Sequence, residues 1–530
     1  MQVDWTLTDP APQPYLAALS TLHPSTAQVL YARGQHDPDQ ARAFLDADER
    51  HAPPADPLRL KDMQRAVDRI LAGIGNGEKI VVYGDYDCDG VTASVLLVTT
   101  LRSLGANVHC YIPDRFEEGY GLNSAALDTL KSEGASLIVT VDCGARAHRE
   151  ALHARDISLD LIITDHHETE HGSLPDAVAF INPRRPDCTY PFKKLAGVGV
   201  AFRLAQVLLR QHRAQSGQTS GISMRALLEL VAVGTVADIV SLTGENRWLV
   251  RAGLQHINKT PRVGVRALMQ VARVPIGSVN AGRVGFALAP RLNAAGRLEH
   301  ALAAFELLMT DDPAQADTLA QQLNAQNEHR QHITTQMAQH AELAALYEQA
   351  DTPLLFAAST DYNPGVIGLA AARLVEKYYR PAIVISISNG EARGSCRSVN
   401  GFHITEALDA CESLLLRHGG HAAAAGFTTS VDKLDELQAK LVGLAREAQP
   451  ALGWQRRLHA DGEIELDRIN GKLVSELEKL EPHGMENSKP TFVARNVQIV
   501  SAQRMGKVPS GGPGPHLKLQ VRQMGEMHND

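Results

Sequence analysis

Short apolar runs separated by amphipathic stretches mark the first half of this 530-residue chain. The runs lie at residues 80–83, 108–112, 137–141, 161–164 and 177–181. Runs of this length are typical of strands buried in a parallel sheet, and the segments between them have the spacing of helices. Residues 56–240 are therefore predicted to form an α/β domain with a doubly wound parallel sheet.

The pattern changes after residue 240. Residues 241–350 are mainly helical, and the stretch 314–349 contains no Gly or Pro, which predicts one long helix that connects two lobes. Residues 351–450 return to alternating strands and helices, so a second α/β domain is expected there. Residues 455–530 have a β-like pattern, whereas residues 1–55, rich in Pro and Ala, are predicted to be a small helical lead-in.

Carboxylates gather directly behind the first apolar run. Asp85, Asp87 and Asp89 occupy alternate positions where a predicted strand gives way to a helix. This transition lies at the carboxyl edge of the sheet, where open α/β folds bind ligands. Because so much like charge repels itself, a bound cation is expected. An EF-hand is excluded, since the position of its bidentate glutamate is Leu96 and a strand precedes the loop.

Further acids and histidines follow three later segments of the same kind. They are Asp142, Asp165, His166, His167 and Asp238. Two of the segments are strand-like and the third, which leads to Asp238, is mainly helical. A capping role explains any one such acid, but four segments that each deliver an acid or a histidine favour a shared metal site. Aspartate and neutral histidine suit Mn²⁺ or Mg²⁺, and imidazole favours Mn²⁺.

These strings resemble a known superfamily. GDYDCDG, VDCG, TDHH and VGTVAD are similar to the four motifs of the DHH phosphoesterases, and NPGVIG, RGSCRS and GGHAAAAG are similar to the associated DHHA1 domain. PRLNAAGR and GYGL narrow the resemblance to the RecJ single-strand-specific exonucleases. The resemblance covers nearly the whole chain. It implies a DHH domain, a long helical connector, a DHHA1 domain and an OB-like domain in this order.

The resemblance implies two-metal hydrolysis of phosphodiesters in single-stranded DNA, in repair and recombination. The expected polarity is 5′ to 3′, with release of 5′-mononucleotides. The expected ligands are Asp85, Asp87 and Asp142 for one ion, and Asp89, Asp142, His166 and Asp238 for the other. Asp142 is expected to bridge the ions, since a carboxylate offers one oxygen to each. His167 is expected beside the scissile phosphate, where it donates a hydrogen bond or a proton. The alternative is that His167 orients His166.

Contacts to the DNA strand are also implied. Ser395, Arg397 and Arg297 are expected to form a pocket for the terminal phosphate, with Gly420 and His421 nearby. Arg115 and Tyr120 are expected at the mouth of the site, where the tyrosine offers a face for base stacking. The remaining candidates are Arg291, Asn293 and Arg393.

Composition limits the other possibilities. With 52 basic and 60 acidic residues the chain is acidic, so binding of nucleic acid must depend on a local basic track. The six cysteines are scattered without a C-x-x-C pair, which argues against structural zinc and disulfides and indicates a reducing cytoplasm. The sequence contains no apolar run of 18 residues, so no membrane span is expected, and the pattern does not predict a secretory signal. P-loop and G-x-S-x-G motifs are missing, which disfavours NTPase and serine-hydrolase activities.

Two alternative functions stay open from the sequence. One is a DHH-family oligoribonuclease or cyclic-dinucleotide phosphodiesterase, whose members generally lack the helical insert and the C-terminal β module. The other is a catalytically inactive DHH-like replication scaffold, which is expected to have lost metal-binding carboxylates. Because the chain stops at GEMHND soon after one strand, we expect either an incomplete OB-like barrel or an altered C-terminus. Single-strand-binding protein and a helicase are expected partners of a monomer.

Overall fold

The computed structural model divides into two compact units. It describes residues 3–46, 55–115, 118–119, 121–169, 173–298, 300–347, 350–450, 453–507 and 513–524. The first unit contains residues 55–240 and 244–456, and the second contains residues 2–54, 241–243 and 457–530.

A five-stranded parallel sheet opens the first unit, with the strand order β3-β2-β4-β5-β6. The strands are β2 (Lys79–Gly84), β3 (Asn107–Tyr111), β4 (Ala135–Val141), β5 (Asp160–Thr164) and β6 (Ala179–Ile181). Each overlaps one of the five apolar runs. The central strands are buried on both faces, which explains why their sequences are continuously apolar.

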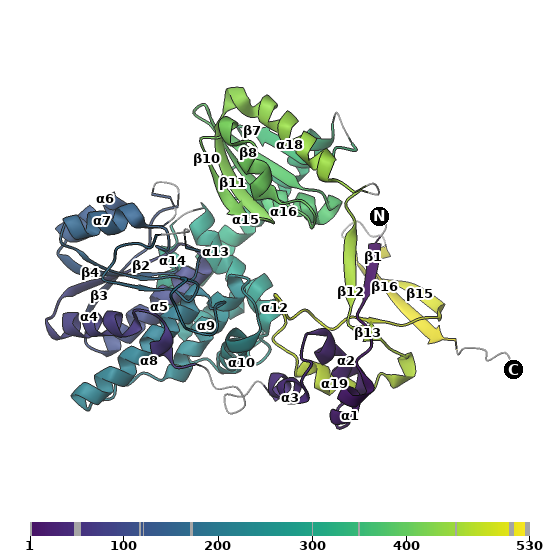
Figure 1. The fold of residues 1–530 in the computed structure, drawn as a ribbon, viewed down its shortest axis with the longest axis horizontal. Coiled ribbons are helices and arrows are strands. Elements are labelled where there is room, and N and C mark those ends of the chain that lie inside the picture. Colours follow the sequence, from purple (N-terminus) through teal and green to yellow (C-terminus); the bar gives the residue numbers. More distant parts are fainter. Residues whose placement is uncertain are drawn as a thin grey trace. The chain divides into compact units, whose positions relative to one another are not determined.

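Helices cover both faces of this sheet (Figure 1). On one face α6 (Ser124–Ser132) and α7 (His148–Asp156) pack on Val81, Tyr83 and Ile138. On the other face lie α4 (Met63–Gly75), α5 (Cys88–Ser103) and α8 (Gly197–Ser216). The prediction of a doubly wound α/β fold is confirmed. After β2 the chain continues to β3 on one side of the sheet, whereas after β4 it continues to β5 on the other side. The carboxyl ends of β2 and β4 therefore form the switch point at which such folds bind ligands.

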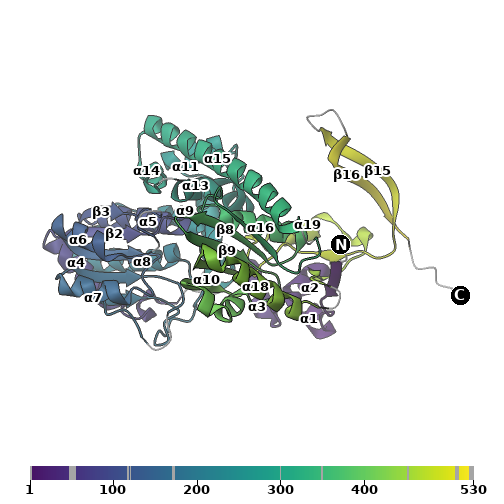
Figure 2. The same ribbon diagram turned by 90° about the horizontal axis from the view of Figure 1, so that it is seen from above.

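A helical region follows the first sheet. Its helices are α9 (Met224–Ala237), α10 (Gly244–Ile257), α11 (Val263–Val271), α12 (Ala281–Arg283), the π-helical η2 (Val284–Leu288), α13 (Ala289–Leu298), α14 (Leu302–Met309) and α15 (Pro313–Leu346). Figure 2 shows α11, α13 and α14 beside the long α15. Asp312 caps α15 by accepting a hydrogen bond from the amide of Ala314 at 2.9 Å, and proline occupies the first turn.

The second lobe of this unit is built on a mixed five-stranded sheet with the order β10-β11-β9-β8-β7. Its strands are β7 (Leu355–Ser359), β8 (Ala382–Ser388), β9 (Glu391–Arg397), β10 (Arg417–His421) and β11 (Ala424–Ser430). Only β7 and β8 pair in parallel. Helices α15 and α16 (Ile367–Tyr378) share a core with β7 and β8 on one face, and α17 (Ile404–Asp409) and α18 (Leu434–Ala448) cover the other.

The second unit combines both ends of the chain. Its helices are α1 (Gln13–Ala18), α2 (Pro24–Ala32), α3 (Pro38–Asp46) and α19 (Gly471–Glu478). Leu480, two residues after the end of α19, is fully buried among Tyr15, Leu19 and Leu30 of the N-terminal segment. The lead-in and the C-terminal region, separate in the sequence, therefore share one hydrophobic core.

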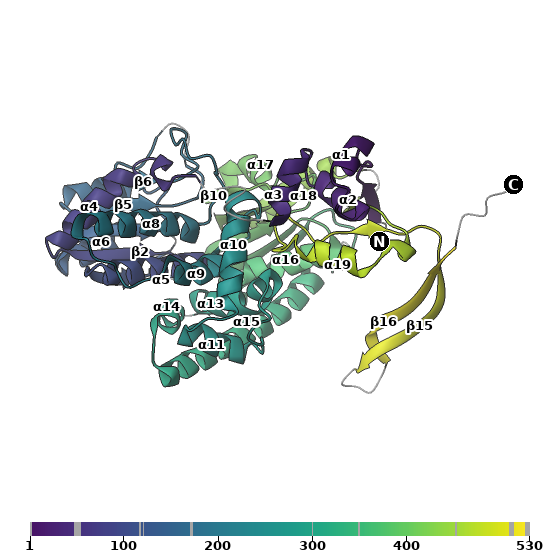
Figure 3. The same ribbon diagram turned by 90° about the horizontal axis from the view of Figure 1, so that it is seen from below.

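The strands of the second unit pair two by two. The pairs are β1 (Val3–Leu7) with β12 (Arg456–Ala460), β13 (Gly462–Glu463) with β14 (Phe492–Val493), and β15 (Val497–Lys507) with β16 (Pro513–Gln523). Figure 3 shows β15 and β16 as a long two-stranded ribbon. Within the described ranges these strand pairs do not close into a barrel. No helix in the described part of the chain has the length and apolarity that a membrane span requires.

Candidate metal centre and phosphate pocket

The first acidic loop joins β2 to α5. Asp85 follows the strand and is buried, and Asp87 caps the helix by accepting hydrogen bonds from the amides of Asp89 (2.8 Å) and Gly90 (3.1 Å). The amide of Cys88 donates to Asn293 Oδ1 at 2.7 Å. Hydrogen bonds of the backbone therefore hold the loop in one conformation, which fixes where its carboxylates point.

Asp142 directly follows β4 and has a left-handed backbone conformation, with a φ of 64°. This conformation costs a non-glycine residue about 1–2 kcal/mol. Its amide donates to the carbonyl of Thr164 at 3.0 Å, and its side chain lies against Gly197, where an added Cβ would collide with the carboxylate. The neighbouring strand and the start of α8 thus hold Asp142 in place. Glycine at position 197 permits this close approach.

Asp89 is also held by the first turn of α8. Its oxygens accept hydrogen bonds from the amides of Gly197 (2.7 Å) and Val198 (2.9 Å), where the helix dipole favours negative charge. Burial and the charge of Asp87 outweigh these bonds and raise the pKa of Asp89 to about 7. Asp238 caps the carboxyl end of α9, and burial and the charge of Asp89 raise its pKa to about 9. The charge of His167 lowers both pKa values only in part, so the ionised forms of the two carboxyls are poorly stabilised.

His166 lies among these carboxylates. Its Nε2 is 3.1 Å from Asp142 Oδ1, 3.4 Å from Asp238 Oδ2 and 4.0 Å from Asp89 Oδ2. Burial and the neighbouring charge of His167 lower the pKa of His166 to about 3, so the imidazole is neutral. A neutral imidazole is the form that binds a metal ion.

Asp165 orients both histidines. Its Oδ1 accepts hydrogen bonds from the amides of His166 (2.6 Å) and His167 (3.1 Å) and lies 2.7 Å from His167 Nδ1, while its Oδ2 accepts from the amide of Ala145 at 2.7 Å. Burial opposes protonation of His167, but Asp165 outweighs this effect and raises the pKa of His167 to about 9. The His167 side chain is 42% exposed, so a substrate can reach it.

The arrangement fits divalent cations. Two sets of side chains each bring ligand atoms within 4.8 Å of one another, and a third set that contains Asp142 and His166 overlaps them. The two sets are Asp85, Asp87 and Asp142, and Asp89, His166 and Asp238. Asp142 Oδ1, Asp85 Oδ1 and His166 Nε2 are buried without a hydrogen-bond partner among the described residues. Since buried polar atoms rarely lack partners, these atoms are suited to bind ions. All six predicted ligands thus meet at the switch point.

A second polar site lies at the start of α16 in the DHHA1-like lobe. Arg397 Nη1 donates to Ser395 Oγ (3.3 Å) and to the carbonyl of Cys396 (2.8 Å). A Cβ added at Gly368, in the first turn of α16, would lie 2.9 Å from Ser395 Oγ and 3.0 Å from Arg397 Nη2. The free amides of a helix N-terminus beside a guanidinium and a hydroxyl form an arrangement that binds phosphate.

Arg297 connects the two sites. Its Nη1 donates to the carbonyl of Gly365, just before α16, at 3.4 Å. Burial and the charges of Arg115 and Arg330 lower its pKa to about 10, while the charge of Asp87 opposes them. These arginines repel one another, so a bound anion would stabilise the cluster.

The other predicted substrate residues are placed as follows. The Arg115 guanidinium lies over the Tyr86 ring at 4.9 Å, and Arg291 donates to Asn324 Oδ1 (2.9 Å) and the Ala287 carbonyl (2.6 Å). On the second sheet Arg393 is exposed, and His421 is in register with Ala424, which is in register with Arg397. Gly420 precedes His421 in β10 and is in register with Ala425. Tyr120 lies outside the described residues.

Arg330 was not predicted as part of this site. It lies on α15, donates from Nη2 to Asn327 Oδ1 at 2.9 Å, and its Nε is buried without a hydrogen-bond partner in the described part of the chain. The sequence around it is a long polar helix, in which one arginine resembles any solvated charge. Only the packing of α15 brings it near Arg297.

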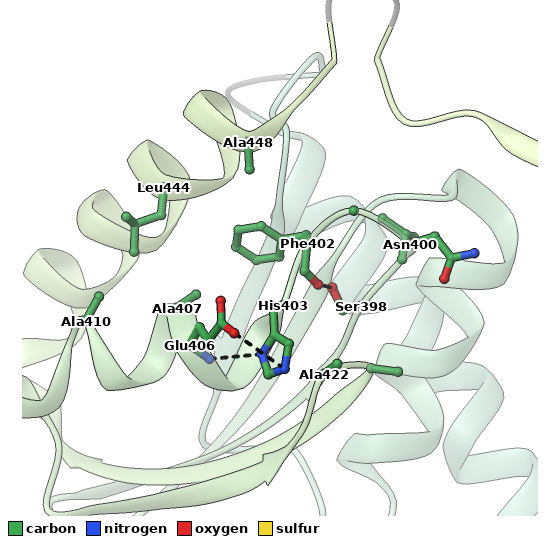
Figure 4. Close-up of a pocket in the computed structure, with 13 residues that line it drawn as sticks. Ser398, Asn400, Phe402, His403, Glu406, Ala407, Ala410, Ala422, Leu444 and Ala448 are labelled. Carbon is green, nitrogen blue, oxygen red and sulfur yellow. Dashed lines mark hydrogen bonds and ion pairs between the residues drawn. The ribbon is translucent and has the colours of Figure 1, made fainter.

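A separate cavity of about 530 Å³ lies in the second lobe. Figure 4 shows it between the loop at 398–403, α17 and α18. Small apolar side chains line most of it, and His403 Nε2 lies 3.8 Å from Glu406 Oε1. Its lining includes none of the side chains in the metal-binding sets, so it is distinct from the metal centre.

Comparisons with known proteins agree with this geometry. Residues 79–235 match the DHH family, N-terminal domain, residues 351–447 match the DHHA1 domain, and residues 460–529 match the RecJ OB domain.

Two curated relatives are described as single-stranded-DNA-specific exonuclease RecJ. The protein from Bacillus subtilis is 39% identical over 522 residues, which cover 98% of this chain and 64% of that protein. The protein from Escherichia coli is 36% identical over 483 residues, which cover 88% of this chain and 82% of that protein. The crystal structure of RecJ in complex with Mn²⁺ from Thermus thermophilus superposes with a TM-score of 0.82 at 31% identity, covering 98% of this chain and 72% of that one.

Proposed function

The chain belongs to the RecJ family of single-stranded-DNA-specific exonucleases, and on this basis we propose that it removes nucleotides from an end of single-stranded DNA by metal-dependent hydrolysis. The observation that carries the proposal is the convergence of six aspartate and histidine ligands in two sets joined by Asp142. Mn²⁺ is the expected metal and Mg²⁺ the alternative.

Some of these side chains bind the metal ions, and others contact the substrate. Asp85, Asp87 and Asp142 would hold one ion, and Asp89, His166 and Asp238, together with Asp142, would hold the other. When bound, the ions stabilise the charge of the phosphate and lower the pKa of a water molecule. Asp165 fixes the ring of His167, which donates a hydrogen bond or a proton to the substrate at the exposed end of the site.

Recognition of a strand end is assigned to the polar site in the second lobe. Ser395, Arg397 and the first turn of α16 bind the terminal phosphate, and Arg297 bridges from this site toward the metal centre. Hydrolysis of the first P–O3′ bond behind a bound 5′-phosphorylated end would release a 5′-mononucleotide and leave a new 5′-phosphate on the shortened strand. The polarity comes from the family and is part of the proposal.

Replacing Arg397 by alanine should weaken recognition of a 5′-phosphorylated end. A hydrogen bond to a charged group contributes about 1.5–3 kcal/mol, so KM for 5′-phosphorylated strands should rise by roughly 10- to 150-fold. The metal sets do not include Arg397, so Mn²⁺ binding should be unchanged. Arg446→Ala, on the exposed side of α18, is the matched control. An unchanged preference for a 5′-phosphate over a 5′-hydroxyl in competition assays would remove this role.

Replacing Asp165 by asparagine should separate orientation from metal binding. The variant keeps the shape but loses the charge that holds His167 Nδ1 and the buried amides. Changes to such supporting partners typically lower activity by about 10- to 100-fold. Steady-state kinetics with saturating Mn²⁺ should show the loss in kcat rather than in KM. If kcat is retained, orientation of His167 by Asp165 does not contribute to hydrolysis.

One assay distinguishes the remaining alternatives. Strands labelled at the 5′ or 3′ end, single or duplex, are incubated with Mn²⁺ and compared with a dinucleotide. Preference for the long single strand supports the proposal, whereas faster cleavage of the dinucleotide would indicate an oligoribonuclease or cyclic-dinucleotide phosphodiesterase. Failure to bind Mn²⁺ would indicate an inactive scaffold. Action as a monomer in the cytoplasm, together with single-strand-binding protein and a helicase, belongs to the proposal on family grounds.

A further inference from the structure

Phe286 is the most exposed large apolar side chain in the described part of the chain, at 91%. It lies in the π-helical segment η2, whose ends Val284 and Leu288 are fully buried. The segment is therefore anchored in the core while its central aromatic ring faces solvent. Single exposed apolar residues are common and need no functional explanation. However, π-helical segments are rare and are frequent at functional sites.

The elements that contact η2 also carry the metal centre. A Cβ added at Gly285 would lie 3.6 Å from Val236 Cγ1, so η2 packs on the end of α9, two residues before Asp238. The following helix, α13, carries Asn293, which holds the acidic loop through Cys88. Asn293 lies seven positions after Phe286, roughly 10 Å along a helix. Phe286 therefore lies near the metal centre but outside it.

The charge around Phe286 suits a nucleic-acid strand. Residues 274–298 contain Arg283, Arg291 and Arg297 but no aspartate or glutamate, although the whole chain is acidic. Arg283 is exposed in the turn before η2, and Arg291 is half-buried one turn after it. Glu328 on α15 partly offsets the charge of Arg291, so the exposed Arg283 is the more available cation. An aromatic ring beside an exposed arginine is a combination with which proteins bind single strands through base stacking and phosphate contacts.

We propose that Phe286 stacks on a nucleobase of the single strand and positions the strand on its path through the metal centre. This inference rests on the proposed function and deepens it, because it names a contact to a base rather than to a phosphate. Since every base has an aromatic face, the contact tolerates any sequence, as an exonuclease requires. The π-helical turn holds the backbone of Phe286 through Val284 and Leu288, so the ring is presented without help from the DNA.

The test compares three substitutions at this position in the full chain. Phe286→Ala removes one stacking contact and should weaken binding of an oligodeoxythymidine of about 12 nucleotides by roughly 10-fold. Binding is measured by anisotropy in EDTA, so that no strand is cleaved. Phe286→Trp should restore affinity, and Phe286→Leu, apolar but not aromatic, should not. Tyr347→Ala removes another ring, 88% exposed, whose sequence neighbours Glu342 and Asp351 are acidic, and should have no effect.

A strand of abasic residues isolates the stacking contact. Wild type and Phe286→Ala should bind it equally, because it offers no base to the ring. Equal weakening on abasic and normal strands, or full rescue by leucine, would overturn the proposal, as would unchanged binding of the alanine variant. The last result is expected if Phe286 contacts only a partner protein. Hydrolysis of the normal strand by wild type with Mn²⁺ is measured in parallel, so failure of the proposed exonuclease function is recognised separately.

Discussion

Asp142→Ala abolishes strand hydrolysis and weakens Mn²⁺ binding at both ligand sets together. We expect this result because Asp142 belongs to one set and its Oδ1 lies 3.1 Å from the His166 ligand of the other. Loss of several kcal/mol of charge stabilisation at the phosphate corresponds to a fall in turnover of at least about 10³-fold. Turnover is measured on end-labelled single strands, and Mn²⁺ stoichiometry by titration calorimetry. Asp128→Ala, an exposed acid of the same domain paired with His153, is the matched control.

A second measurement on this position does not depend on activity. Burial and the charges of Asp89 and Asp87 raise the pKa of Asp142 well above its usual value, so the ionised side chain destabilises the metal-free fold. The isosteric variant Asp142→Asn should therefore melt at a higher temperature than wild type in EDTA and at a lower one in saturating Mn²⁺. Near-normal turnover of the alanine variant, or loss of only one ion, would contradict the bridging assignment.

Removing the metal should make the stability of the first unit strongly dependent on pH. The folded pKa values of Asp89 (about 7) and Asp238 (about 9) lie above the value near 4 expected in the unfolded chain. Such groups contribute stability at low pH that is lost as the pH rises through the folded pKa. His167, raised to about 9, acts in the same direction. The metal-free melting temperature should therefore fall steadily from pH 6.5 to pH 9.

Bound Mn²⁺ should reverse this trend. Metal ligands must be deprotonated, so binding strengthens as the pH rises, and a ligand that binds only the folded state stabilises it. His166, with a pKa of about 3 in the folded protein, is already neutral above pH 6.5 and does not disturb the comparison. Melting curves with EDTA and with Mn²⁺ should diverge by several degrees at pH 9 and converge at pH 6.5. Parallel curves would mean that the acids do not bind the ions.

The assembly of the metal centre could be predicted from local patterns. Apolar runs as short as Ile80–Tyr83 form strands only when buried on both faces, which implies a parallel sheet with helices on each side. Parallel strands place their carboxyl ends at one edge, so the acids after β2, β4 and β5 had to lie close together. The resemblance of GDYDCDG and TDHH to known motifs then added the chemistry that spacing alone does not supply.

Other features could not be predicted, because they depend on contacts between distant segments. The left-handed Asp142 is held by Gly197, and the acidic loop by Asn293, which is 205 positions from Cys88. Arg330 looks like any polar residue of a long helix until α15 packs beside α13. A single apolar position such as Phe286 is expected to be buried, and only the π-helical turn exposes it.

By itself, then, the sequence determined which segments become strands and helices and which strand ends carry acids, since hydrophobic period and turn chemistry act locally. The tertiary structure alone decided which of those strand ends meet α8 and α9 at the metal centre and which arginines lie beside it. It also decided that the N-terminal and C-terminal segments share one hydrophobic core. The physical reason is that a hydrophobic pattern encodes which face of an element is buried, but not the partner that buries it.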